Sequence, residues 1–149
     1  MYKLMVVDDE YNIRDGIANA IPWADHNIEV AAQAGNAVEA IGKFDQCHPD
    51  IVITDIIMDD MTGLDLIEHL YQKNPNIKVV IISGYDDFEF AKRAIQLKVS
   101  SYLLKPIVPE ELLAIVDNLV RDIEETRRIR EKMLSLEDEL EQGRAFLLE

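Results

Sequence analysis

Five short apolar runs recur along the chain, and each is followed by a polar turn and then by apolar residues at helical spacing. Runs that are apolar throughout, and do not alternate with polar residues, are typical of strands buried on both faces. Strands that alternate with helices form right-handed βαβ units and a parallel sheet. The sequence therefore predicts a doubly wound α/β fold. Its expected strands are Lys3–Val7, Ile28–Ala32, Ile51–Thr54, Ile77–Ile82 and Ser100–Leu104.

Composition narrows the class of protein. The chain has 149 residues, of which 48% are apolar, and a net charge of -14. Such acidity disfavours direct nucleic-acid binding, because phosphate contacts need clustered Lys and Arg, but it is compatible with divalent cations. Asp8 comes too early for a signal peptide, and no apolar run approaches the roughly 20 residues of a membrane span. We expect a cytoplasmic protein without a membrane segment. Cys47 is the only cysteine, which leaves no intrachain disulfide.

Polar residues gather where four of the predicted strands end. In sheets of this type, ligands bind beyond the carboxyl ends of the strands. Each residue alone has an ordinary role as a helix cap, loop acid, turn former or surface charge. Their occurrence at four strand ends favours a shared site. The residues are Asp8 and Asp9 after the first strand, Asp55 after the third, Ser83 and Gly84 after the fourth, and Lys105 after the fifth.

These groups suit one kind of chemistry. Three acids in one cleft repel one another, and a hard cation such as Mg2+ relieves the repulsion through oxygen ligands. Mg2+ and a lysine stabilise charge on a transferred phosphoryl group, a hydroxyl and backbone N–H groups bind its oxygens, and a carboxylate can act as nucleophile. The pattern predicts phosphoryl transfer onto an aspartate. It leaves open which of the three acids is the acceptor.

The motifs resemble, in the same order, those of the receiver domain of two-component response regulators. The resemblance covers residues 2–123 and implies a flavodoxin-like parallel sheet with strand order 2-1-3-4-5. The matching segments are Asp8-Asp9, Asp55 followed by Met58, Met61 and Gly63, Ser83-Gly84, and Tyr102-Leu103-Leu104-Lys105-Pro106.

The resemblance also implies a role for each site residue. Asp55 is expected to be the phosphoacceptor, and Asp8, Asp9, Asp55 and the backbone carbonyl of Ile57 are expected to hold Mg2+. The phosphoryl group would be bound by Ser83, Gly84 and Lys105. Ser83 would also be the switch hydroxyl, and Tyr102 the aromatic that changes rotamer with it.

A sensor histidine kinase is the partner that the resemblance implies as phosphoryl donor. Such a protein is not an enzyme, since it catalyses only its own phosphorylation and dephosphorylation. Ile21-Pro22-Trp23 and the segment 83–88 are similar to the subclass whose output is an AraC-type helix-turn-helix domain. No such domain fits within these residues, so DNA binding and transcription regulation are expected only through an output domain outside them.

One position departs from the family pattern. Asp59 stands where the family usually has proline, and Asp60 follows it. Added negative charge beside the site would raise the demand for Mg2+ and disfavour a phosphorylated loop. The alternative is that both side chains face solvent and have little effect.

The chain is expected to divide into a receiver domain, 1–123, and a helical coiled-coil linker, 124–149. From Leu112 to Leu147, mostly apolar positions advance by steps of four and three, with one repeated three-step from Thr126 to Ile129, as in a heptad seam with a stammer. We expect a homodimer through residues 116–147. A solvated linker is the alternative, which Arg127-Arg128-Ile129-Arg130 and the gap at Gly143 favour.

Two other functions remain open at this point. A Mg2+-dependent phosphohydrolase with an aspartyl-phosphate intermediate would use similar groups, but no segment forms a substrate cap, and Asp8-Asp9 is not the spaced acid pair of haloacid-dehalogenase-type enzymes. A receiver-like interaction module that takes no phosphate is the other, and Asp59 is its only support.

Helical periodicity gives further expectations for packing. Val38, Ile41 and Phe44 are predicted to form the buried side of the second helix, and Phe88, Ala91 and Ile95 that of the fourth, with Phe90 off the buried side. Capping pairs are expected at Thr62 with Asp65 and at Asp86 with Glu89.

Overall fold

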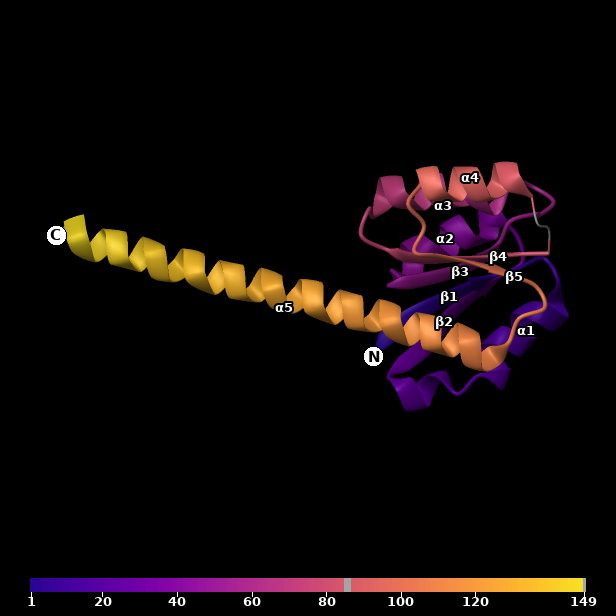
Figure 1. The fold of residues 1–149 in the computed structure, drawn as a ribbon, viewed down its shortest axis with the longest axis horizontal. Helices are drawn as coiled ribbons and strands as arrows, with labels where there is room; N and C mark the ends of the chain where they lie inside the picture. Colours follow the sequence, from indigo (N-terminus) through magenta and orange to yellow (C-terminus); the bar gives the residue numbers. More distant parts are fainter. Residues whose placement is uncertain (85–86, 149) are drawn as a thin grey trace. The chain divides into compact units, whose positions relative to one another are not determined.

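The structure, a computed structural model, describes residues 1–84 and 87–148, the last five of them as backbone only. Five strands form one parallel sheet in the order β2-β1-β3-β4-β5 (Figure 1). This order confirms the predicted flavodoxin-like α/β fold. The strands are β1 (Tyr2–Val7), β2 (Ile28–Ala34), β3 (Ile51–Asp55), β4 (Lys78–Ser83) and β5 (Ser101–Leu104).

Helices connect the strands and cover both faces of the sheet. α2, α3 and α4 cover one face, and α1 lies on the other (Figure 1). The chain divides into two compact units, Met1–Val116 with the sheet and Asp117–Glu149 with the remainder of α5. The helices are α1 (Tyr11–Ala20), α2 (Ala37–Cys47), α3 (Gly63–Lys73), α4 (Phe88–Gln96) and α5 (Pro109–Leu148), with a 3-10 helix η1 (Trp23–His26) after α1.

The core lies on both sides of the central strands, because successive side chains of a strand point to opposite faces. One set packs with the residues of α2, α3 and α4 and comprises Met5, Val7, Val52, Val79 and Ile81. The alternate set is equally buried and comprises Leu4, Val6, Ile51, Ile53, Val80 and Ile82. Burial on both faces explains why these strands are apolar throughout.

Side-chain caps begin α2, α3 and α4, and those of α3 and α4 test the predictions. The Thr62 hydroxyl accepts the N–H of Asp65 at 3.1 Å, as predicted for α3. The cap of α4 is Asp87, whose carboxylate accepts the N–H groups of Glu89 and Phe90 at 2.8 and 3.3 Å. Asp86, the predicted cap, lies outside the described residues.

The buried side of α4 differs from the prediction. Phe88 and Ile95 are 75% and 78% exposed, whereas Ala94 is buried and Phe90 and Leu97 pack against the core. At 100° per residue, these two sets lie on opposite sides of the helix. Both sides carry apolar residues, so periodicity could not choose between them, and packing against the sheet decides.

The buried side of α2 is also different from the one predicted. Val38 is 66% exposed, and the buried residues are Ala37, Ala40 and Phe44, with Ile41 partly buried. Small alanines allow the helix backbone to approach the sheet, and Val38, in the first turn, faces away. The prediction was therefore right for Phe44 and wrong for Val38.

The two edge strands, β2 and β5, are the least regular parts of the sheet. β2 is longer than predicted and ends at Ala34, and its register with β1 shifts between Leu4 and Met5. β5 has only four residues. Just before β5, the Ser100 hydroxyl accepts the N–H of Val79, and the Ser100 N–H donates to the carbonyl of Val79, so Ser100 continues the pairing with β4.

α5 is one uninterrupted helix that begins at Pro109, a residue suited to a first helical turn. It continues through Gly143, where the sequence left a gap in the apolar stripe. Leu112 and Val116 of its first turns are fully buried. None of the helices in the described residues combines the length and the apolarity that crossing a membrane requires.

Candidate functional site

Three acids meet at the carboxyl ends of β1 and β3. Asp8 and Asp9 follow β1, and Asp55 is the last residue of β3. One carboxylate oxygen from each of the three lies within 4.8 Å of the others. Asp8 and Asp55 are buried, with 1% and 6% exposure, and Asp9 is exposed. The parallel register of β1 and β3, which pairs Val7 with Thr54, brings these strand ends together.

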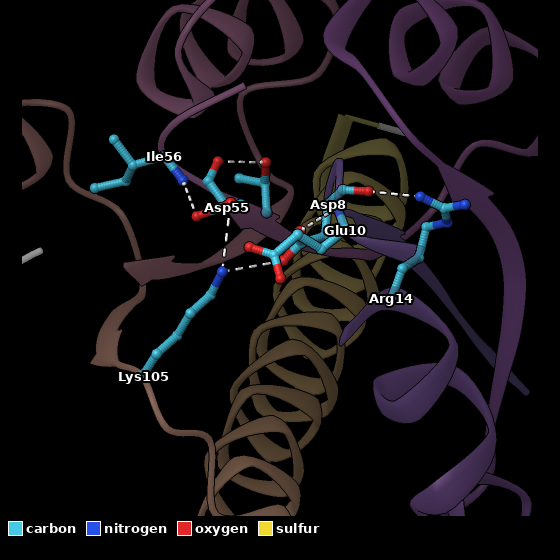
Figure 2. A network of polar contacts seen from close by, with 7 residues as sticks. Asp8, Glu10, Arg14, Asp55, Ile56 and Lys105 are labelled. Carbon is cyan, nitrogen blue, oxygen red and sulfur yellow. Dashed lines mark hydrogen bonds and ion pairs between the residues drawn. The ribbon is translucent and has the colours of Figure 1, made fainter. Parts of the chain in front are cut away.

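Lys105 supplies the positive charge that faces this cluster. Its ammonium lies 3.5 Å from the Asp8 carboxylate and 3.4 Å from that of Asp55 (Figure 2). The Lys105 N–H also donates to the Ser83 carbonyl at 2.7 Å, which ties the residue after β5 to the end of β4. The structure therefore brings together the acids and the lysine that the sequence placed at separate strand ends.

Burial and mutual repulsion raise the pKa values of the buried acids. The pKa of Asp8 rises from 3.8 to about 6 because of burial, against the opposing hydrogen bond from the Glu10 N–H at 2.9 Å, and nearby Asp55 raises it further. Burial likewise raises the pKa of Asp55, although Lys105 opposes the shift. For Lys105, burial lowers the pKa, but Asp55 and Asp8 outweigh it and the net shift is upward.

The three carboxylates of the cluster carry more negative charge than the single ammonium of Lys105 compensates. A divalent cation with a preference for oxygen ligands would remove the imbalance, because it favours the ionised form of each acid. The three carboxylates supply oxygen ligands close enough together for one ion, and oxygen ligands are those that Mg2+ prefers. The residues present therefore fit a Mg2+ ion.

Arg14 is a contributor that sequence reasoning missed. It lies on α1, and its guanidinium donates to the backbone carbonyl of Asp8 at 2.6 Å (Figure 2). The same group lies 5.5 Å from the centre of the Tyr11 ring. These contacts hold the turn between β1 and α1. A cation six residues after an acid carries no local sequence signal for this contact.

Ser83, Gly84 and Tyr102 lie around the same edge. Ser83 ends β4 and is fully buried, and Gly84 is exposed beside Lys105, where an added Cβ would lie 3.8 Å from the lysine Cδ. Tyr102 lies in β5 and packs against the core. Its hydroxyl oxygen is buried and has no hydrogen-bond partner among the described residues. Their roles toward a phosphoryl group remain predictions.

The loop after Asp55 closes tightly. Its first amide, the Ile56 N–H, donates to the Asp55 carboxylate at 2.8 Å (Figure 2). At the far end, the Gly63 N–H donates to the Ile56 carbonyl at 2.6 Å, and a Cβ on Gly63 would overlap the Asp55 carbonyl oxygen. Only glycine fits there. Ile57, the predicted carbonyl ligand, lies inside this closed loop and is 39% exposed.

The two acids of this loop differ from each other. Asp59 is exposed, which agrees with the expectation that its side chain faces solvent. Asp60 is also exposed, but its carboxylate accepts the N–H groups of Ala37 and Val38, in the first turn of α2, at 3.1 and 2.9 Å. The sequence suggests either that Asp60 adds repulsion at the site or that it is a surface charge with little effect. This contact with α2 fits neither expectation.

Comparison with known proteins identifies the class that this fold and site define. The family described as "Response regulator receiver domain" matches residues 4–117. The transcriptional regulatory protein HptR of Staphylococcus aureus (strain NCTC 8325) is 41% identical over 123 residues, which are 83% of this chain and 48% of HptR. The uncharacterized transcriptional regulatory protein YesN of Bacillus subtilis (strain 168) is 34% identical over 146 residues, 98% of this chain and 40% of YesN.

A solved structure agrees with these relatives. The REC domain of AraT, a response regulator from Geobacillus stearothermophilus, is similar with a TM-score of 0.79 at 36% identity, over 85% of this chain and 98% of that one.

This chain belongs to the response regulator receiver domain family, as its motifs predicted. A receiver domain is typically a non-enzymatic signalling switch of a two-component system, and it implies a cognate histidine kinase. Its acidic triad is consistent with the Mg2+ site typical of receivers. The chain spans less than half of the length of HptR and YesN, which are both named as transcriptional regulatory proteins.

Proposed function

We propose that this chain is a phosphorylation-dependent switch in which Asp55 accepts a phosphoryl group from a sensor histidine kinase. One observation carries the proposal: the Asp55 carboxylate ends β3 beside the Lys105 ammonium, at 3.4 Å, and within reach of two further acids. A nucleophilic carboxylate needs positive charge beside it, both to stay ionised and to stabilise the transferred group.

The reaction forms one bond and breaks one. A carboxylate oxygen of Asp55 attacks phosphorus, and the bond from phosphorus to the donor nitrogen of phosphohistidine breaks. The electron pair stays on the imidazole, which takes up a proton from water. Lys105 favours the ionised, reactive form of Asp55 against the upward effect of burial on its pKa. In this mechanism the chain catalyses only its own phosphorylation and dephosphorylation.

Asp8, Asp9, Asp55 and the backbone carbonyl of Ile57 are the groups that would hold Mg2+. When bound, Mg2+ supplies positive charge that compensates the acids and the phosphoryl oxygens. Two hydrogen bonds hold Asp8 in position: the Glu10 N–H donates to its carboxylate, and the Arg14 guanidinium donates to its backbone carbonyl.

The switch follows from the groups around the new phosphoryl group. Lys105, the Ser83 hydroxyl and the backbone at Gly84 bind its oxygens, since each lies at the same edge of the sheet. Movement of Ser83 toward the phosphoryl group makes room for Tyr102. The buried hydroxyl of Tyr102, without a hydrogen-bond partner among the described residues, supports this role, because a buried unpaired hydroxyl costs free energy and favours a change of partner.

The output passes through the helical linker, 124–149, that follows the receiver domain, 1–123. Ile129, Met133, Leu136 and Leu140 are spaced by four, three and four residues and are between 49% and 64% exposed. A coiled-coil homodimer through residues 116–147 would bury them. The names of the relatives support an output domain that regulates transcription, and we propose an AraC-type helix-turn-helix domain that binds DNA, in a cytoplasmic protein.

Incubation with acetyl phosphate and Mg2+ tests the acceptor. We expect a stable mass gain of one phosphoryl group that Asp55→Asn abolishes, while Asp59→Asn, an exposed acid in the same loop, leaves it unchanged. Rapid phosphate release without an adduct would instead indicate a phosphohydrolase. No reaction at all, from acetyl phosphate or from a phosphorylated kinase, would indicate an interaction module that takes no phosphate.

Sedimentation tests the dimer. The whole chain is compared with one that ends near Arg121, before the exposed stripe, and with a whole chain in which Met133→Gln and Leu136→Gln make the stripe polar. We expect a dimer only for the unmodified chain. Monomer masses for all three proteins, before and after phosphorylation, would contradict the coiled coil.

A further inference from the structure

The Asp60 carboxylate joins two segments that are 23 residues apart in the chain. One of its oxygens accepts the Ala37 N–H at 3.1 Å, and the other accepts the Val38 N–H at 2.9 Å. The first of these oxygens also accepts the Met61 N–H at 2.9 Å. A single side chain of the β3–α3 loop therefore satisfies two of the N–H groups that the start of α2 leaves without helical partners.

Asp60 is an addition to the normal cap of α2. The cap position itself is filled by Asn36, whose side chain accepts the Glu39 N–H at 2.8 Å. Asn36, at the cap position of α2, and Asp60, in the β3–α3 loop, thus bind different N–H groups of the first turn. Loss of Asn36 would weaken the helix alone, whereas loss of Asp60 would also release the loop.

The loop between Asp55 and α3 is then held at two places. Near its base, the Gly63 N–H binds the Ile56 carbonyl at 2.6 Å. Near its tip, Asp60 binds α2. Ile57 and Met58 lie between the two attachments, and Met58 is buried in the core. The backbone of Ile57 is therefore restrained on both sides.

The charge of Asp60 is also compensated where it lies. The N-terminus of a helix carries a partial positive charge, which stabilises a carboxylate bound to its N–H groups. The lowered pKa of Asp60, caused first by the Val38 N–H and also by those of Ala37 and Met61, agrees with this compensation. Asp60, which is close in sequence to the acidic cluster, thus makes a structural contact in which the helix N-terminus already compensates its charge.

We propose that Asp60 is a positioning residue of the phosphorylation site: it fixes the β3–α3 loop to the start of α2, so that the Ile57 carbonyl is held ready for Mg2+. This inference rests on the function proposed above, because it assigns Ile57 to the Mg2+ site. It predicts that Asp60 affects Mg2+ affinity without touching the ion. It also predicts that bound Mg2+, by restraining the loop, slows hydrogen exchange of the Ala37 and Val38 amides.

Two variants separate positioning from helix stability. Asp60→Ala removes the contact between loop and helix, and Asn36→Ala removes the cap of the same helix without altering the loop. Both are expected to lower the melting temperature by a similar amount, since each leaves N–H groups of one helix start unpaired. Asp60→Asn keeps one carbonyl oxygen as acceptor and is expected to fall between wild type and Asp60→Ala.

Mg2+ affinity of the unphosphorylated whole chain, measured by calorimetric titration with MgCl2, is the deciding readout. Groups that orient metal ligands typically change affinity by 10- to 100-fold, and we expect a loss of about 10-fold for Asp60→Ala. Asn36→Ala should bind Mg2+ as wild type does. With acetyl phosphate, Asp60→Ala should react slowly at low Mg2+ and recover at saturating Mg2+.

Three results would overturn the proposal. The first is a Mg2+ affinity of Asp60→Ala equal to that of wild type. The second is a loss of Mg2+ affinity in Asn36→Ala as large as that in Asp60→Ala. The third is a rate of hydrogen exchange at the Ala37 and Val38 amides that does not change when Mg2+ is added. Failure of the proposed function is recognised separately. A wild-type chain that binds Mg2+ but forms no phosphoryl adduct would contradict that function, while the Mg2+ titrations and exchange rates would still decide the role of Asp60.

Discussion

Asp8 and Asp60 follow neighbouring strands of the same sheet, yet their surroundings shift their pKa values in opposite directions. Asp8 is 1% exposed, and burial raises its pKa to about 6 even though it accepts the Glu10 N–H. Asp60 is exposed and accepts N–H groups of α2, which lower its pKa. Hydrogen bonding to the charged form favours ionisation in both cases. Burial beside other acids decides the result for Asp8.

The difference separates two uses of a carboxylate. At the start of α2, the Asp60 carboxylate stabilises the fold through backbone N–H groups and needs no cation. In the cluster, a buried acid reduces stability unless positive charge compensates it, and the same imbalance would favour the binding of a cation. Functional sites often reduce stability in this way. The following substitutions test the contrast, from the largest expected effect to the smallest.

Lys105→Met should be the most damaging change, because it leaves Asp8 and Asp55 without the ammonium that lies 3.5 and 3.4 Å away. Removing one partner of a buried charge pair typically costs about 3 to 5 kcal/mol of unfolding free energy. We expect that loss at neutral pH without Mg2+, and a smaller one near pH 4, where Asp8, with a pKa of about 6, holds a proton in the folded state. Urea unfolding at the two pH values measures it. Equal losses would show that Lys105 acts by packing and not by charge.

Asp8→Asn should stabilise the Mg2+-free protein at neutral pH. Asparagine keeps an oxygen for the Glu10 N–H, which lies 2.9 Å from Asp8, and removes the buried charge. The pKa of Asp8 is about 6 in the folded protein and 3.8 ordinarily, so the folded protein binds more protons between these values. Stability contributed by this group therefore falls as pH rises from about 4 to 6, by about 2 to 3 kcal/mol.

The measurement for Asp8 is urea unfolding across that pH range. Wild type should lose stability as pH rises, the variant should lose less, and the two should agree near pH 4. Added Mg2+ should stabilise wild type more than the variant at neutral pH, because ligand that binds only the folded state raises its stability. A less stable Asp8→Asn protein at neutral pH without Mg2+ would contradict the reading of Asp8 as a destabilising acid.

Asp60→Ala should change stability at neutral pH in the opposite direction to Asp8→Asn and destabilise the protein. Loss of acceptors at a helix N-terminus typically costs about 1 kcal/mol, and we expect this loss at neutral pH. A lowered folded-state pKa means that the contribution is present above the ordinary pKa of 3.8 and is lost as pH falls through the lower value. Thermal unfolding at neutral and strongly acidic pH measures the difference between variant and wild type. A difference that does not shrink on acidification would show that the carboxylate charge is irrelevant.

Asp59→Asn should have the smallest effect. Asp59 is exposed and adjoins Asp60 in the loop, and surface substitutions of this kind usually change stability by less than about 0.5 kcal/mol. The same unfolding measurement, made beside Asp60→Ala, provides a matched comparison between neighbouring acids. An effect as large as that of Asp60 would mean that the position of the charge in the loop matters more than its hydrogen bonds.

The sheet and the cluster could be predicted because few residues are available at each strand end. Once the apolar runs fix the strands, Asp8, Asp55 and Lys105 can only lie at the carboxyl edge. The Thr62 cap was predictable for a similar reason, since its partner Asp65 is three residues away. Order along the chain and local spacing contain this information.

The errors come from contacts that local spacing does not determine. In α4, one side carries Phe88 and Ile95 and the other Phe90 and Leu97, so the period fits either, and only the neighbouring sheet selects the second. The contact of Asp60 with α2 is of the same kind. Its partners are 23 and 22 residues away, and a carboxylate next to a helix start in space leaves no pattern in the sequence.

The form of the edge strands affects how copies of this chain meet one another in concentrated solution. An exposed edge can pair with another chain and seed aggregates, and short or irregular edges resist this. β5 has four residues, and the ladder beside β2 shifts register between Leu4 and Met5. Neither edge presents a long regular template. Edge-to-edge pairing between the sheets of two copies is therefore disfavoured, so any specific association between copies is left to helical surfaces.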